Sequence, residues 1–162
     1  MRILILLLMS LPVAALAQDC KLIRETDPYT KQTRLSSGFI TLQGASVSIE
    51  ADAGEIDFFF SLPGKCFNDA STVFIYFEGS KSKTTYRNAG SMNCDGYFHF
   101  KYRNAQATNS VLNKLATQPV AHFIFIGNDK KEVTVSLLPD QQKQFMEAAA
   151  CVTNEAKTLL KN

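Results

Sequence analysis

Residues 97–103 read Tyr97-Phe98-His99-Phe100-Lys101-Tyr102-Arg103, with a large apolar side chain at every second position. Successive side chains of a β-strand point to opposite faces of the sheet. Phe98, Phe100 and Tyr102 therefore share one face, and the residues between them share the other. The stretch predicts a strand with one buried face and one half-solvated face.

The same period of two extends over Ser36–Arg103, where helical periodicity is absent. Gly, Asn, Asp and Ser residues separate the apolar runs, and several of the connections are short enough for hairpins. These features predict successive antiparallel strands. The predicted strands are Thr33–Leu42, Ser46–Glu50, Glu55–Leu62, Thr72–Glu78, Lys83–Arg87 and Tyr97–Arg103.

The period changes after residue 103. Asn109 or Thr108 can cap a short helix that must end before Pro119. Val120–Ile126 is apolar on both faces, which predicts a strand in the centre of the sheet. Glu132–Leu138 follows across a turn-forming triplet and is expected to pair with it.

The last predicted element runs from about Pro139 to Leu160, where apolar side chains recur at helical spacing. We expect this amphipathic helix to pack on one face of the sheet, with a membrane-surface or partner-binding helix as the alternative. The predicted fold class is α+β: a single domain, mostly antiparallel β-sheet, with a short helix and a long C-terminal amphipathic helix packed on the sheet. The apolar stripe consists of Phe145, Ala149, Val152, Ala156 and Leu159.

The first residues have the pattern of a secretory signal peptide. One charge, at Arg2, precedes an apolar run, and the small residues Ala15 and Ala17 mark a cleavage site. The run is broken by a serine and a proline and is too short for a membrane anchor. We expect residues 1–17 to be a signal peptide and residues 18–162 to form one exported domain in the periplasm or outside the cell.

Four cysteines allow three pairings. Cys66 and Cys94 stand just outside the two strands of one predicted hairpin, whose return brings the two sulfurs together. Cys20 and Cys151 remain for a second bridge. Structural disulfides are expected in an exported protein, whereas a redox pair or a zinc site would need closely spaced cysteines or histidines, which are missing.

Basic and aromatic side chains are interleaved on the strands between residues 81 and 103. Such residues on one sheet face can bind anionic polymers, single strands or glycans. This face is the leading candidate binding surface, and an ordinary solvent-facing side is the alternative. The candidate ligand-binding residues are Lys81, Lys83, Arg87, Lys101, Arg103, Tyr86 and Tyr97.

Residues that could carry chemistry are sparse. His99 and His122 are the only histidines, and no nucleophile motif accompanies them. Four carboxylates surround one predicted turn, but their spacing matches no calcium loop and favours a solvated hairpin tip. These carboxylates are Glu50, Asp52, Glu55 and Asp57. No catalytic residue, metal or cofactor is assigned.

The chain also resembles small uncharacterised secreted proteins of Bacteroidota. The resemblance lies in Asp19-Cys20 and in the order of elements over Leu112–Cys151: a short helix, an apolar strand, a charged turn, a second strand and a long amphipathic helix. It implies a fold and no activity.

Function is bounded by charge and by the missing motifs. Without Arg2, 16 of the 17 basic residues remain against 15 acidic ones, so we expect no nucleic acid partner. We expect a non-enzymatic exported binding or structural domain whose partner is an anionic ligand or another exported protein. The alternatives are a small secreted hydrolase that uses His99 or His122, and an inhibitor or immunity-type partner of another exported protein.

Overall fold

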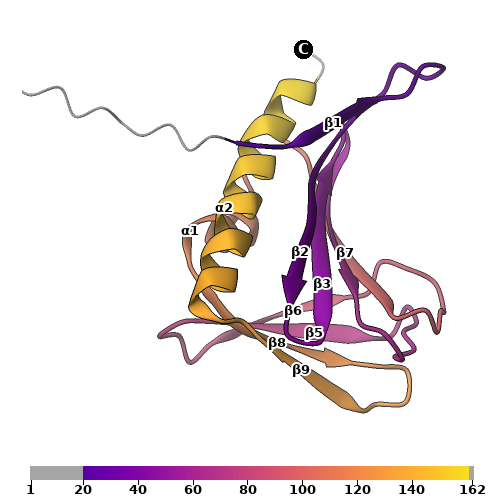
Figure 1. Cartoon of the computed structure of the whole chain (residues 1–162), viewed down its shortest axis with the longest axis vertical. Helices are drawn as coiled ribbons and strands as arrows, with labels where there is room; N and C mark the ends of the chain where they lie inside the picture. The colour runs from indigo at the N-terminus through magenta and orange to yellow at the C-terminus, as the bar shows by residue number, and fades with distance from the viewer. Residues whose placement is uncertain (1–19, 161–162) are drawn as a thin grey trace, which may run out of the picture.

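The computed structural model describes residues 20–160 and is an α+β domain of two antiparallel sheets and two α-helices (Figure 1). The predicted fold class is thus confirmed. The predicted signal peptide, residues 1–17, lies outside the described residues. In Figure 1 the strands of one sheet run across the direction of the strands of the other, and the C-terminal helix stands beside the first sheet.

The first sheet has five strands in the order β1-β2-β3-β4-β7. Its predicted strands are present within one or two residues at each end, and β1 is an additional strand that the sequence did not predict. All four residues of β1 are exposed, so they carry no apolar alternation. The strands are β1 (Ile23–Thr26), β2 (Thr33–Leu42), β3 (Ala45–Ala51), β4 (Glu55–Ser61) and β7 (Tyr97–Arg103).

The second sheet has four strands in the order β6-β5-β8-β9. As predicted, Val120–Ile126 is a central strand, since β8 lies between β5 and β9. The division into two sheets was not predicted, and it separates β6 from β7 although they are consecutive in the chain. The strands are β5 (Thr72–Phe77), β6 (Lys83–Arg87), β8 (Val120–Ile126) and β9 (Glu132–Ser136).

Both predicted helices are present. The Asn109 side chain caps α1 (Ser110–Thr117) by accepting hydrogen bonds from the N–H groups of Val111 and Leu112. α2 (Pro139–Ala156) continues into a 3₁₀ turn, and it contacts β2, β3 and β4 of the first sheet. Its buried stripe includes Phe145, Ala149, Val152 and Ala156. Within residues 20–160, no helix has the length and apolar character needed to cross a membrane.

Phenylalanine rings fill the junction of the two sheets. Phe60 is fully buried, and its ring centroid lies 5.0 Å from that of Phe123 and 5.2 Å from that of Phe125. Phe67 and Phe98 join the same cluster in an edge-to-face contact at 5.4 Å. The inward-facing positions of both sheets therefore meet in one aromatic core, which holds the sheets in a fixed relation.

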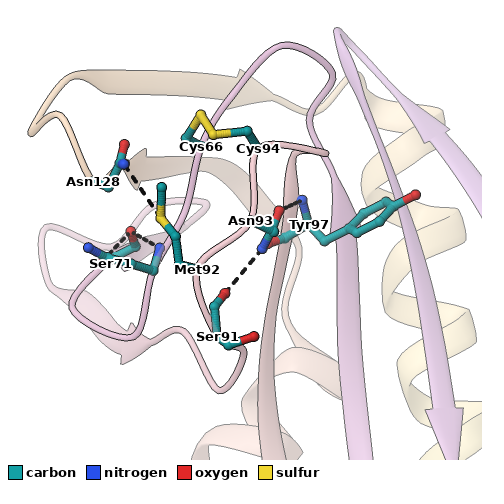
Figure 2. Close-up of a disulfide and its surroundings, with 9 residues drawn as sticks. Cys66, Ser71, Ser91, Met92, Asn93, Cys94, Tyr97 and Asn128 are labelled. Atoms are coloured by element: carbon teal, nitrogen blue, oxygen red, sulfur yellow. Dashed lines mark hydrogen bonds between the residues drawn. A yellow bond between two sulfur atoms is a disulfide. The ribbon is translucent and has the colours of Figure 1, made fainter.

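Both predicted disulfides are present, Cys66–Cys94 and Cys20–Cys151. Figure 2 shows the Cys66–Cys94 bridge and Asn93 beside it. Phe67 and Asn93 exchange a pair of backbone hydrogen bonds, so the segments before β5 and after β6 lie together as expected. The second bridge joins the start of the described chain to α2.

The two sheets also enclose a pair of tyrosines. The Tyr86 and Tyr102 ring centroids are 5.3 Å apart. Burial raises the pKa of Tyr86; burial and the neighbouring Tyr86 raise the pKa of Tyr102 far above its ordinary value. The folded protein therefore holds both phenols in their neutral form.

We expect alkali to destabilise the protein through these phenols. An unfolded chain loses tyrosine protons near pH 10, so the raised folded pKa gives stability that is complete below about pH 10 and lost above it. For Tyr102 the loss is about 1.4 kcal/mol per pH unit. In urea unfolding at about pH 9, 10 and 11, the unfolding free energy of Tyr102→Phe should fall less steeply with pH than that of the wild type. Equal slopes for the two proteins would contradict the prediction.

Candidate functional site

The first sheet has a face turned away from α2, which we call the outer face. The pairing of β2, β3, β4 and β7, with one bulge in β2, places an aromatic row next to a charged region on this face. We call these regions the aromatic end and the charged end. The aromatic end consists of Phe39, Phe59, Tyr97 and His99; the charged end consists of Glu25, Arg34, Glu50, Asp52, Glu55, Asp57, Lys101 and Arg103.

The aromatic end is built by cross-strand neighbours. Phe59 lies opposite His99, with ring centroids 6.1 Å apart, and diagonal to Tyr97, with centroids 5.2 Å apart. Phe39 is two strands away, with Ser48 between it and Phe59. Phe39 is 68% exposed and Tyr97 is 44% exposed. Large apolar rings are thus presented to solvent from rigid strands.

A β-bulge turns Phe39 outward. Leu35 is buried, so uninterrupted alternation would place Phe39 on the inner face as well. The register instead shifts between Ser36 and Phe39, where Gly38 adopts a φ of 68°. Ser37 Oγ accepts a hydrogen bond from the Ile49 N–H at 3.0 Å and anchors the bulge to β3. Bulges are a common means of redirecting one side chain at a functional surface.

His99 has a carboxylate partner but no catalytic surroundings. Its Nδ1 lies 2.9 Å from Asp57 Oδ2, as a hydrolase would require. The other ring nitrogen faces Gly90, on which an added Cβ would lie 2.9 Å from Nε2. The described residues include no Ser, Thr or Cys side chain that hydrogen-bonds to His99. The ring is therefore held between a carboxylate and a loop.

The loop over His99 is itself fixed. Asn88 is buried, and its Oδ1 accepts a hydrogen bond from the His99 N–H at 3.0 Å. The Ala89 N–H donates to the His99 carbonyl at 2.7 Å. The second histidine, His122, belongs to the other sheet and stacks on Tyr76 with ring centroids 4.5 Å apart. The two histidines therefore share no site.

In the charged end, Lys101 and Arg34 pair with carboxylates. Lys101 Nζ donates to Glu55 Oε1 and lies 3.7 Å from Asp57 Oδ2, and the bond to Glu55 is the main cause that raises the Lys101 pKa. Arg34 Nη1 lies 3.6 Å from Glu50 Oε2. Lys101 is consequently engaged within the face and is not a free cation for an anionic ligand.

A groove of 660 Å³ adjoins the charged end, and its acidic lining residues are Glu25, Asp27 and Asp52. Asp27 Oδ1 accepts hydrogen bonds from the Tyr29 and Thr30 N–H groups, each at 2.7 Å. These bonds lower the pKa of Asp27 and keep it ionised. Asp52 caps the turn between β3 and β4 in the same manner. Among residues 20–160, no cluster of three or more His, Cys, Asp or Glu side chains could hold a metal ion.

Another groove, of 670 Å³, lies beside α2 and the Cys20–Cys151 bridge. Its lining mixes apolar residues such as Leu22 and Ile40 with Lys21 and Glu147, and it contains no aromatic ring. Its charged lining residues are one lysine, Lys21, and two glutamates, Glu147 and Glu155, and none of its lining residues is an exposed aromatic anchor. We therefore place the candidate site on the outer face.

The seven residues predicted to share one basic and aromatic face are dispersed. The prediction of a shared face is wrong because β6 and β7 belong to different sheets. Tyr86 packs inside the protein on Phe100, with ring centroids 4.8 Å apart, and Lys83 Nζ lies 3.5 Å above the Phe74 ring. Lys81, Lys83 and Arg87 lie at the β5–β6 hairpin, while Tyr97, Lys101 and Arg103 lie on the outer face.

The comparisons with known proteins found no match to a family model, a curated protein or a solved structure. We therefore infer function from the geometry of this chain.

Proposed function

We propose that the protein is a non-enzymatic, exported binding domain whose outer face holds another exported protein. Export is supported by the signal-like pattern of residues 1–17 and by two disulfides, which persist in oxidising compartments. The observation that carries the binding role is Phe39, which is 68% exposed and is turned outward by a bulge in β2.

An exposed ring of this kind is suited to a protein partner. Aromatic side chains are enriched in the cores of protein interfaces, and a few of them supply most of the binding energy. Phe39, Phe59 and Tyr97 lie on strands and lose little backbone freedom when a partner packs against them. The aromatic end therefore has the composition and the rigidity of an interface anchor.

The same geometry disfavours the two other roles. A hydrolase that uses His99 would need a nucleophile and an open approach to Nε2, whereas Gly90 occupies that side. An anionic ligand on the outer face would meet Lys101 already paired with Glu55 and Asp57. A protein partner needs neither a catalytic group nor a free cation.

Site-specific photo-crosslinking tests this role. A photoreactive phenylalanine analogue replaces Phe39 in one variant and the exposed Thr85 of β6 in the control, and each is incubated with the exported fraction of producing cells. We expect adducts from position 39 and none from position 85. Excess unlabelled wild type should compete for adduct formation, and excess Phe39→Ser should not.

The unfolding free energy of Phe39→Ser is the internal control. Phe39 is largely exposed, so its replacement should change this free energy by no more than about 0.5 kcal/mol. Equal adduct formation at both positions would contradict the proposal. Competition by Phe39→Ser as effective as that by the wild type would also contradict it.

A further inference from the structure

We propose that the partner segment bound by the outer face is extended, cationic at one end and apolar at the other, with the cationic end in the groove beside β1. This inference rests on the proposed function and names the chemistry of its partner. The positive charge of this partner segment is opposite to the charge of the anionic ligand that the sequence led us to expect.

The charged end of the outer face has an excess of negative charge. It contains five carboxylates and three cations, so its formal charge is negative with His99 neutral. Two of the cations, Arg34 and Lys101, are already paired within the face. Added positive charge from a partner would therefore meet an excess of carboxylates.

The carboxylates without a lysine or arginine partner are gathered in the groove beside β1. Glu25, Asp27 and Asp52 line the 660 Å³ groove, and no ion pair involves any of them within residues 20–160. Backbone N–H groups fix the carboxyl groups of Asp27 and Asp52. These two carboxyl groups are thus already held in place, so little conformational entropy is lost when a cationic ligand binds them.

The groove and the aromatic end are close enough for one short segment to contact both. Arg34, at the groove, and Phe39, at the aromatic end, belong to the same strand and are five residues apart. At about 3.3 Å per residue this is roughly 16 Å. An extended segment of about five residues spans that length. Basic residues at one end of such a segment and apolar residues at the other would contact both ends of the face together.

The experiment uses a fluorescent peptide with three lysines at one end and Leu-Phe-Leu at the other, and a control peptide with glutamates in place of the lysines. Fluorescence anisotropy measures binding to the full exported chain. We expect the lysine peptide to bind and to lose affinity as salt rises, because the charged end is exposed. The glutamate peptide should not bind.

Two sets of variants locate the contact. Glu25→Gln with Asp27→Asn removes two charges and keeps the acceptor oxygen that the Tyr29 and Thr30 N–H groups use. We expect this pair to weaken binding about fivefold, and Phe39→Ser about tenfold. The matched control, Asp69→Asn with Glu132→Gln, removes two exposed charges elsewhere and should change affinity by less than about 1.5-fold.

Several outcomes would overturn the inference. These are binding of the glutamate peptide, equal effects of the two charge-neutralising pairs, and crosslinks from position 39 that join two copies of this chain. If crosslinking from position 39 to another protein succeeds while the lysine peptide fails to bind, the proposed function stands and the cationic partner is wrong. Failure of crosslinking removes the proposed function itself.

Discussion

Replacing Gly96 with alanine should lower the unfolding free energy by about 4 kcal/mol. Gly96 adopts a φ of 83°, which costs a residue with a Cβ about 1 kcal/mol. An added Cβ would also overlap the Leu62 carbonyl oxygen and lie 2.6 Å from its carbon. The overlap is with backbone, so relief requires a shift that breaks the 2.8 Å bond from the Leu62 N–H to the Gly96 carbonyl.

Gly64 and Gly44 provide matched controls. Each has a φ of 74°, and an added Cβ at either position meets nothing within 4 Å. Alanine there should cost only the conformational term of about 1 kcal/mol. Urea unfolding of the three variants separates the two terms. If Gly96→Ala is no less stable than Gly64→Ala, the close approach of the Gly96 and Leu62 backbones is wrong.

Alternation of side chains predicts most of this fold because one face of each strand is buried. Strands β2 to β8 lie within two residues of their predicted ends, and Phe98, Phe100 and Tyr102 are buried together. The C-terminal helix was equally evident from its stripe. These features can be predicted because the hydrophobic period and the helix caps are determined by residues close together in the sequence.

Features that depend on pairing between distant segments could not be predicted. Alternation gives the faces of a strand but not its neighbours, so nothing local places β7 beside β4 and β6 in the other sheet. The long connection from Asn88 to Gly96 was the available hint, because hairpin loops are usually shorter. β1 was not predicted because all four of its residues are exposed, so no buried face imposes an alternation of apolar side chains on its sequence.

The candidate site shows the same limit. The side to which His99 and Lys101 point was predicted, but their partners Asp57 and Glu55 come from a strand more than 40 residues away. The outward turn of Phe39 depends on a bulge whose local signal, Ser37-Gly38, also fits an unbroken strand. Tyr97 and His99 were therefore predicted to share a face, but their proximity to Phe59 and Phe39 could not be predicted. The basic residues were predicted on one surface, which the topology divides between two sheets.

Removing the Cys20–Cys151 bridge by replacing both cysteines with serine should cost about 4 kcal/mol of unfolding free energy. The bridge joins residues 131 apart, and loop closure of that length restrains the unfolded chain by about 5 kcal/mol. Part of this is offset, because β1 is exposed throughout and frays in the native state once it is released. The offset is about 1 kcal/mol, the free energy of restoring backbone freedom to about one residue.

The Cys66–Cys94 bridge is the matched comparison. It closes a loop of 28 residues, which corresponds to about 3.5 kcal/mol. The Phe67–Asn93 backbone pair and the β5–β6 hairpin hold its flanks in place, so little native fraying offsets that value. Hydrogen exchange distinguishes the two bridges: loss of Cys20–Cys151 should speed exchange in β1 and at the β2 edge it covers, and leave β5 and β8 protected. Uniformly faster exchange in both sheets would show instead that the N-terminal bridge supports the whole core, and that β1 is not an independently fraying edge.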